Sequence, residues 1–262
     1  MKTSPYHTVE GLISQELLIV GKNSILHPTT VYILEDYQGV ARPITIGNNV
    51  RIDPFSILFG GVTIGDNTII EPYVTIGKPE LGYAVQKEYS GEGKNTKIGD
   101  RVIIRAHATL YDGIVIGNKT SIGHYTLIRN DVVIGNHTQL GHYVCVERGV
   151  HIGNYVRCSP HGHITSETVL EDRVFIGAHV ATINDKKMVW KDKKETPTLN
   201  PPYFEHGVKV GTGSVIGSGV RIGRETLIGS HSLVISDIAS NSIAYGSPAK
   251  IVQPAKKPIS KK

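Results

Sequence analysis

The chain has 262 residues, a formal net charge of +5 and only two cysteines. Two cysteines are too few for a disulfide scaffold, and no apolar run approaches the roughly 20 residues of a membrane span. Aromatic residues are few and the basic residues are dispersed through the chain, so we expect no nucleic-acid partner. Residues 1–10 lack the apolar core of a signal peptide, so we expect a cytoplasmic protein with no membrane partner.

Residues 1–45 read as an irregular start, and a regular pattern begins at Ile46. From there a bulky aliphatic residue returns every six positions. This period suits neither an α-helix, whose faces recur at about 3.6 residues, nor one long strand, whose faces recur at about 2. It predicts short strands joined by corners, which is a β-helix of hexapeptide repeats. In the central stretch the aliphatic positions are Ile98, Ile104, Leu110, Ile116, Ile122, Ile128, Ile134, Leu140, Val146 and Ile152, and after Cys158 they continue with Ile164, Leu170 and Ile176.

The inward residues of such a helix should form one continuous apolar column, so truncating Ile134 to Ala should cost about 2–5 kcal/mol. Cys158 occupies an inward position and is predicted to be a reduced core thiol. Gly, Asn and Asp gather at the proposed corners, as in Gly117-Asn118. We expect positive φ angles there, which cost little for Gly and are tolerated by Asn and Asp.

The pattern breaks at two loop insertions, residues 77–96 and 183–209, and residues 252–262 form a basic tail that we expect to be mobile. Residues 1–251 are therefore predicted to be a single domain. If three hexads make one triangular coil, both insertions leave from one row of corners, after Ile76 and after Thr182. Long insertions in a compact repeat are usually functional, so this edge is a candidate working edge.

A second row of corners is unusual because it carries ring side chains. A stacked aromatic rib explains the tyrosines, but it explains less well why His124 and His142 lie directly beside the row. These histidines are therefore candidates for function. At steps of one coil the row reads Phe55, Tyr73, His107, Tyr125, Tyr143, His161 and His179.

With this period, the corner glycines and the ending Gly246-Ser-Pro-Ala-Lys250, residues 46–251 resemble the hexapeptide-repeat acyltransferases. Residues 175–179 and Asn184-Asp185, which a Pro-containing loop follows, look like the branch that acylates amino groups of dTDP- or UDP-linked deoxysugars. The resemblance implies an all-β, left-handed parallel β-helix. It also implies a homotrimer with active sites between subunits, and acyl-CoA, acetyl-CoA first, as the co-substrate with no metal.

Acyl transfer to an amine needs an unprotonated nucleophile and a donor to the developing oxyanion. Histidine suits the role of base because its ordinary pKa is about 6.5. We therefore predict His124 and His142, followed by His161, as catalytic residues. The branch also includes enzymes in which the departing sulfur takes the proton, and this alternative stays open.

The resemblance suggests where the two substrates bind. Asn184 and Asp185 are expected to hold the sugar, although a turn cap at the loop entrance explains them equally well. Tyr83 is expected to stack on the nucleotide base and Lys94 to meet its pyrophosphate. In the family, late coils hold the pantetheine arm and a basic residue near the C-terminus meets phosphates. The expected acyl-CoA contacts are Gly211, Ser214, Gly217, Ser232 and Lys250.

Other functions fit the pattern less well. His137 and His142 resemble part of the zinc-ligand pattern of γ-class carbonic anhydrases, but the position two coils before His137 holds Arg101. The insertions and the histidines interrupt the flat face that a non-catalytic β-helix would need. Residues 1–45 show no nucleotidyltransferase domain, so a bifunctional relative is not expected. Serine O-acetyltransferase and tetrahydrodipicolinate N-acyltransferase remain open.

Overall fold

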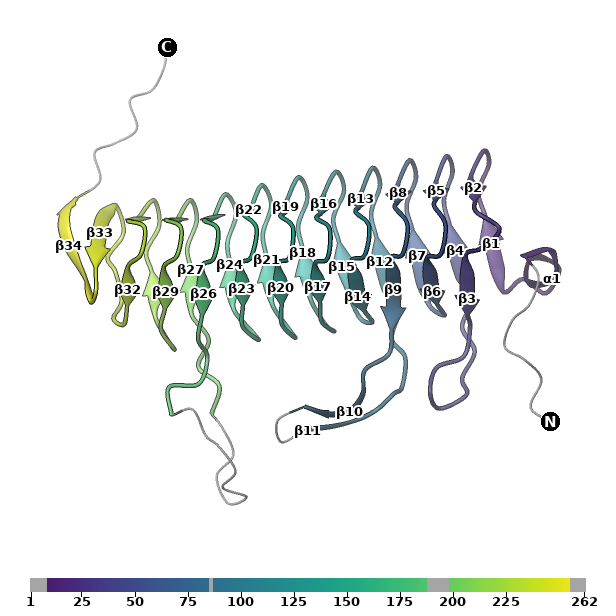
Figure 1. Cartoon of the computed structure of the whole chain (residues 1–262), viewed down its shortest axis with the longest axis horizontal. Helices are drawn as coiled ribbons and strands as arrows, with labels where there is room; N and C mark the ends of the chain where they lie inside the picture. Colours follow the sequence, from purple (N-terminus) through teal and green to yellow (C-terminus); the bar gives the residue numbers. More distant parts are fainter. Residues whose placement is uncertain (1–8, 85–86, 188–197, 255–262) are drawn as a thin grey trace, which may run out of the picture.

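Three long sheets, which we call A, B and C, run along a computed structural model that describes residues 9–84, 87–187 and 198–254. They contain 10, 12 and 10 strands, and nearly all neighbouring strands are parallel. Successive coils stack along one axis, with the N-terminal coils at one end and the C-terminal coils at the other (Figure 1). The chain is a left-handed parallel β-helix of hexapeptide repeats, which confirms the predicted fold class.

The strands are short, and the chain visits the sheets in the order A, B, C. Sheet A contains β1 (Leu18–Val20), β4 (Ile44–Ile46), β7 (Val62–Ile64), β12 (Thr96–Ile98), β15 (Val115–Ile116), β18 (Val133–Ile134), β21 (His151–Ile152), β24 (Val169–Leu170), β27 (Tyr203–Phe204) and β30 (Arg221–Ile222). Sheet B contains β2 (Ile25–Leu26), β5 (Arg51–Ile52), β8 (Ile69–Ile70), β13 (Ile103–Ile104), β16 (Ser121–Ile122), β19 (Gln139–Leu140), β22 (Arg157–Cys158), β25 (Phe175–Ile176), β28 (Lys209–Val210), β31 (Leu227–Ile228), β33 (Ser242–Gly246) and β34 (Ala249–Pro254). Sheet C contains β3 (Val31–Ile33), β6 (Ile57–Phe59), β9 (Thr75–Lys78), β14 (Thr109–Tyr111), β17 (Leu127–Ile128), β20 (Cys145–Val146), β23 (His163–Ile164), β26 (Ala181–Thr182), β29 (Val215–Ile216) and β32 (Leu233–Val234).

The predicted apolar column forms the core. Ile116 pairs with Ile134 in the next coil, and Ile122 pairs with Leu140, so equivalent residues of successive coils stack directly. These side chains are buried, and each coil buries its inward face only against its neighbours. Cys158 is a free, buried thiol in this column, as predicted, and burial raises its pKa to about 12.

The expected positive φ at corners is confirmed at residues such as Asn49, Asn67 and Gly207, but it is not confined to Gly, Asn and Asp. We name each corner by the two sheets that it joins. At the A–B corner the positive φ falls on Lys119 (φ 57°) and not on Gly117. Gly117 is needed for space, because a Cβ there would lie 2.6 Å from the carbonyl carbon of Gly135 in the next coil. The N–H of Lys119 donates to the Asp100 carbonyl at 2.8 Å, and this contact between coils helps to hold a backbone conformation that costs a non-glycine residue about 1–2 kcal/mol.

All the long excursions of the described chain leave from the C–A corner and project from the lower edge of the helix in Figure 1. The prediction that both insertions leave from one corner row is confirmed, since they follow β9 and β26. A third excursion, residues 34–43, follows β3. The second insertion ends earlier than expected, because β27 resumes the helix six residues before Val210. Phe204 takes the inward place of an aliphatic residue there and is fully buried.

Both ends of the helix also differ from the sequence prediction. The segment expected to be an irregular start contains the first coil, β1 to β3, and the helix α1 (Val9–Ser14) packs its buried Leu12 over the end of the core. At the other end β33 and β34 form an antiparallel hairpin. The expected tail therefore begins later than residue 252, and residues 255–262 lie outside the described residues. Both elements cap a repeat that would otherwise expose its core.

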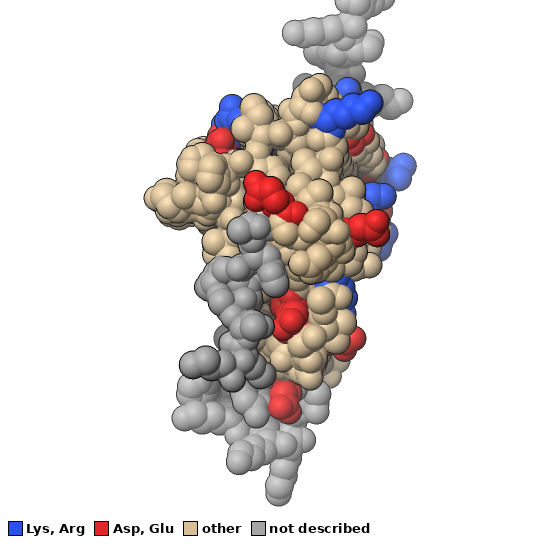
Figure 2. All heavy atoms as spheres, turned by 90° about the vertical axis from the view of Figure 1, so that its right-hand side faces the viewer, with Lys and Arg blue, Asp and Glu red and all other residues tan. Residues whose placement is uncertain are grey.

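Acidic and basic side chains are interspersed on the described surface that faces the viewer at the N-terminal end (Figure 2). In the part of the chain that the structure describes, no helix has both the length and the apolar character needed to cross a membrane. The first insertion contains an antiparallel hairpin of β10 (Leu81–Ala84) and β11 (Lys87–Ser90).

Candidate functional site

The B–C corner carries the predicted row of rings, which we call the ring stack. Ring centroids of successive coils lie 4.6–5.0 Å apart, and the rings are nearly parallel. The rings occupy the second corner residue, which always has positive φ. Because neighbouring strands are about 4.8 Å apart, the coil repeat itself sets a good stacking distance. The members of the stack are Phe55, Tyr73, His107, Tyr125, Tyr143, His161 and His179.

His124 and His142 occupy the first residue of the same corner in successive coils, and their rings stack at 5.0 Å. The backbone N–H of His124 donates to Nδ1 of His142 at 3.1 Å. A ring nitrogen that accepts a hydrogen bond carries no proton, so neutral His142 has its proton on Nε2. The His142 side chain is therefore arranged as a hydrogen-bond donor through Nε2.

The opposite tautomer is favoured for His124. Its Nδ1 lies 3.9 Å from Oε2 of Glu71, and a carboxylate at that side favours a proton on Nδ1. Nε2 of His124 is then free to accept a proton. Burial alone would raise the pKa of Glu71, but hydrogen bonds from the Arg105 guanidinium and from the Ala106 N–H, at 3.0 Å, together lower it. Glu71 is thus held as an anion beside His124.

A hollow of about 350 Å³ opens on the outer face of sheet B beside these histidines. Gly123 and Gly141 form its floor, because they place no side chain where other coils carry one. Arg105 and Arg157 contribute positive charge to its wall, which suits an anionic ligand. Its lining consists of Arg105, Ser121, Ile122, Gly123, Gln139, Leu140, Gly141, His142, Arg157, Cys158, Ser159 and Pro160.

The backbone N–H of His142 is a further donor at this hollow. At the A–B corner the equivalent N–H of Asn118 donates to Oδ1 of Asn136 in the next coil, at 2.7 Å. The coil after His142 instead presents Pro160, whose side chain has no acceptor. Among the described residues, none accepts a hydrogen bond from the His142 N–H. This N–H is therefore available to an oxygen atom of a ligand.

The other predicted site residues lie away from this hollow. His161 is an exposed member of the ring stack, between Tyr143 and His179, and it follows Pro160 of the lining. Asn184 and Asp185 lie at the C–A corner, where the Asn184 carbonyl accepts the Asn200 N–H at 2.7 Å and Oδ1 of Asp185 accepts the Lys187 N–H at 2.9 Å. Such contacts fit the alternative explanation of these two residues, which is a turn cap at the entrance of the loop.

The two residues predicted in the first insertion are also at the C–A corner. The Lys94 ammonium forms an ion pair with the Asp131 carboxylate, with an Nζ–Oδ1 distance of 2.7 Å. Tyr83 belongs to β10, and its side chain lies outside the described residues. Within one chain, then, the structure separates the residues predicted to bind the sugar from the histidines by the width of sheet C.

The residues predicted to bind the acyl donor do not form one site. Gly211 follows β28 of sheet B, Gly217 follows β29 of sheet C, and Lys250 lies exposed in β34. Ser214 and Ser232 are buried, and both hydroxyls donate to the Gly229 carbonyl, at 3.0 and 2.7 Å. The Ser214 bond joins two coils and the Ser232 bond lies within one, so both side chains serve the core, and a contact of these residues with the acyl donor stays a prediction.

Sequence reasoning missed Glu71, Arg105 and Arg157. Glu71 and Arg105 follow the inward Ile70 and Ile104 at a position where later coils have Gly123 and Gly141. The sequence shows that this position holds a charged residue in these two coils and glycine in the later ones. It does not show that Glu71 and Arg105 are in contact, because the first insertion separates their coils in the sequence.

Fold and repeat together define a hexapeptide-repeat β-helix protein. Residues 43–78 and 95–130 match the family described as bacterial transferase hexapeptide (six repeats). This match confirms the hexapeptide-repeat part of the resemblance.

Part of the chain is also similar to known proteins. It is 29% identical over 109 residues to the acyl-[acyl-carrier-protein]–UDP-N-acetylglucosamine O-acyltransferase of Rickettsia bellii, a match that covers 35% of this chain and 34% of that protein. It is 37% identical over 97 residues to the bifunctional protein GlmU of Alkaliphilus metalliredigens, which covers 36% of this chain and 20% of that protein. The matches thus span about a third or less of these relatives.

A solved structure agrees with the fold over most of the chain. The UDP-N-acetylglucosamine acyltransferase from Campylobacter jejuni superimposes with a TM-score of 0.54 at 18% identity, and the match covers 87% of this chain and 74% of that one. At this identity the likeness concerns the fold alone.

Proposed function

We propose that this chain transfers an acyl group from a thioester donor to the amino group of a nucleotide-linked amino sugar, at the hollow of the B–C corner. The observation that carries the proposal is the pair of stacked histidines beside the hollow, because a hydrogen bond to Nδ1 of His142 and the Glu71 carboxylate 3.9 Å from Nδ1 of His124 favour opposite tautomers. The repeat family, and the similarity of part of the chain to an acyltransferase of UDP-N-acetylglucosamine, support acyl transfer to a nucleotide-linked sugar.

In the proposed reaction His124 is the general base. Its Nε2 takes a proton from the sugar amine as the amine nitrogen attacks the thioester carbonyl carbon. The C–N bond forms, the C–S bond breaks, and the departing thiolate takes the proton back from His124, so the products are an amide and a free thiol and the base is regenerated. Glu71 is a positioning residue that keeps Nδ1 of His124 protonated.

The attack places negative charge on the carbonyl oxygen. We propose that the N–H of His142 and its Nε2–H stabilise this oxyanion, since both are donors without a competing acceptor in the described residues. Arg105 and Arg157 would meet phosphate groups of the nucleotide or of the donor.

The donor in this proposal is acyl-CoA, with acetyl-CoA first, as the sequence resemblance implies. The Rickettsia bellii relative is named for an acyl carrier protein and for O-acylation, which favours a second candidate: acylation of a hydroxyl of a UDP-linked N-acetylated sugar. The two candidates share the base and the oxyanion donors, so the acceptor and the donor have to be tested separately.

A screen of free thiol release distinguishes them. Acetyl-CoA, longer acyl-CoAs and acyl carrier protein thioesters are each combined with dTDP- and UDP-linked sugars that carry either a free amine or an N-acetyl group. Release that requires the free amine supports N-acylation. Release only with N-acetylated acceptors supports O-acylation. No release with any pair contradicts both.

The catalytic assignment is tested with His124→Ala. A general base typically contributes 10²–10⁴-fold, so we expect turnover to fall by about that factor while nucleotide-sugar binding changes little. His179→Ala, which removes a ring of the ring stack, is the matched control and should leave turnover close to that of the wild type. Unchanged turnover in both His124→Ala and His142→Ala would remove the histidine mechanism and leave the departing sulfur as the proton acceptor.

We further propose that the working form is a homotrimer whose active sites lie between subunits. Asn184 and Asp185 lie across sheet C from the hollow, so they reach a bound sugar only if they come from a neighbouring copy. Mixing the inactive variants His124→Ala and Asn184→Ala should then restore activity in mixed oligomers. If each variant is inactive and mixing restores nothing, the shared site is ruled out.

A further inference from the structure

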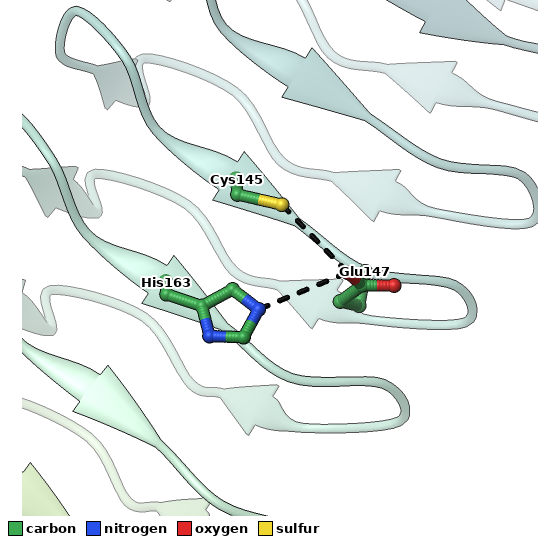
Figure 3. A group of neighbouring side chains, drawn as sticks. All are labelled: Cys145, Glu147 and His163. Carbon is green, nitrogen blue, oxygen red and sulfur yellow. Dashed lines mark hydrogen bonds and ion pairs between the residues drawn. The ribbon is translucent and has the colours of Figure 1, made fainter.

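A second cluster of reactive side chains lies on the outer face of sheet C, and the proposed acyl transfer uses none of them. Cys145 of β20 and His163 of β23 are direct neighbours in the parallel register. Glu147 follows two residues after Cys145. Figure 3 shows the three side chains turned toward one another. Nε2 of His163 and Sγ of Cys145 each lie 3.7 Å from Oε1 of Glu147.

The three donor atoms match the ligands of a zinc ion in kind and spacing. Zinc binds sulfur at about 2.3 Å and nitrogen or oxygen at about 2.0–2.2 Å, so tetrahedral ligand atoms lie roughly 3.5 Å apart. Here all three atoms lie within 4.8 Å of one another. Two of the three separations are already near the required value, so small side-chain rotations would complete the geometry.

Neighbouring charges hold the carboxylate in place. Oε2 of Glu147 accepts a hydrogen bond from Nη1 of Arg129 at 3.1 Å, which leaves Oε1 directed toward the cysteine and the histidine. Nη2 of Arg129 donates to Glu80 at 2.9 Å. Such contacts of a ligand's second oxygen orient a metal ligand and tune its affinity.

The cluster is also open on one side. The residues before and after it in the outward row of sheet C are Leu127 and Ala181, and neither offers a metal ligand. The side chain of His163 is 47% exposed and that of Glu147 is 24% exposed. A fourth ligand would therefore come from solvent or from a bound molecule.

We propose that Cys145, Glu147 and His163 form a zinc site with three protein ligands and one open position. On binding, the cysteine thiol and the protonated His163 each release a proton to solvent, and the thiolate and the carboxylate together neutralise the charge of the ion. Three ligands with an open position are typical of zinc sites that act on a bound water or substrate, whereas purely structural sites are closed by four. The family resemblance implied no metal, and the only zinc-ligand pattern weighed from the sequence was that of His137 and His142.

The test uses the full chain after metal removal with a chelator, titrated with Co²⁺ and then with Zn²⁺. We expect one Co²⁺ per chain, a thiolate-to-cobalt charge-transfer absorption, and its loss when Zn²⁺ displaces Co²⁺. Cys145→Ser should abolish the absorption, and His163→Gln should weaken zinc binding. Arg129→Gln, which frees Glu147, should weaken it by about 10–100-fold.

Two variants are matched controls. Cys158→Ser removes the other thiol of the chain, which is buried. His206→Gln removes a histidine that pairs with Glu225 at the same 3.7 Å but has no cysteine beside it. Both should bind zinc as the wild type does. The site is ruled out if the wild type shows no charge-transfer absorption, if Cys145→Ser keeps it, or if His206→Gln weakens binding as much as His163→Gln. Because no acyl donor or acceptor is present, the result is independent of the proposed function.

Discussion

The B–C and C–A corners of this β-helix share one coil repeat but differ in regularity. From Phe55 to His179 the B–C corner is a two-residue turn in every coil, so like positions stack at the spacing of the strands. The C–A corner is interrupted by the excursions after β3, β9 and β26. The regular corner therefore places groups at fixed distances along the helix axis, whereas the interrupted corner extends the chain away from it.

The two corners also differ in what they bury. The regular corner keeps its rings and histidines at the surface. The C–A corner buries Asp112, whose Oδ2 accepts the Lys94 N–H at 2.7 Å and whose Oδ1 has no partner in the described residues. Desolvation by burial raises the pKa of Asp112 to about 6 despite that hydrogen bond. The irregular corner thus carries an electrostatic cost that the regular corner avoids.

The largest expected effect on stability is at the point where the C–A excursion rejoins the helix. Phe204→Ala should lower the free energy of unfolding by about 3–5 kcal/mol, because it empties the largest fully buried side chain of the core. Urea unfolding at fixed protein concentration measures this loss. Ile134→Ala, in an uninterrupted coil, is the comparison and should cost about 2–5 kcal/mol. A loss near zero for Phe204→Ala would mean that the excursion ends elsewhere.

The next effect depends on pH. The pKa of Asp112 is higher in the folded chain than the unfolded value of about 3.9, so its contribution to stability is complete below about pH 4 and is lost as the pH rises through about 6. A shift of this size corresponds to at most about 3 kcal/mol. Asp112→Asn should therefore lose less stability than the wild type between pH 4 and pH 7, as measured by urea unfolding. Parallel curves for the two proteins would contradict a raised pKa.

A smaller effect is expected in the ring stack. Tyr125→Leu removes ring contacts on both faces but keeps an ordinary residue at the left-handed position, so it should cost about 0.5–1.5 kcal/mol for each lost ring pair. Lys119→Leu is the control. Lys119 occupies the equivalent position of the A–B corner and has positive φ, but its side chain carries no ring. If thermal unfolding shifts equally for both, the rings contribute nothing beyond the turn.

The smallest effect concerns the ion pair of Lys94 with Asp131. Both side chains are largely exposed, and such pairs contribute about 0.2–1 kcal/mol. Asp131→Asn should reduce stability by no more than this, and the reduction should disappear at high salt. A loss that persists at high salt would show that the pair is part of the packed base of the first insertion.

Part of the site was predictable from the sequence. His124 and His142 were singled out because they depart from a row of rings whose coil spacing was known. The tautomer of each histidine was not predictable, since it depends on Glu71 beside His124 and on the backbone N–H that donates to His142. The proposed zinc site was missed although Cys145 and His163 are one coil apart, the same step that aligned the ring stack. What the sequence does not show is that Glu147 turns toward both of them.

The six-residue period determined the class of fold, the inward column and the common corner of both insertions, because a strict repeat leaves the chain few ways to bury its aliphatic residues. Tertiary structure decided where each excursion ends, which residue of a corner takes positive φ, and which serines turn inward. Those outcomes depend on contacts between coils, as with Gly117 against Gly135 and Ser214 against Gly229. A repeat specifies the position of a residue within its own coil, but the neighbouring coil determines what that position can hold.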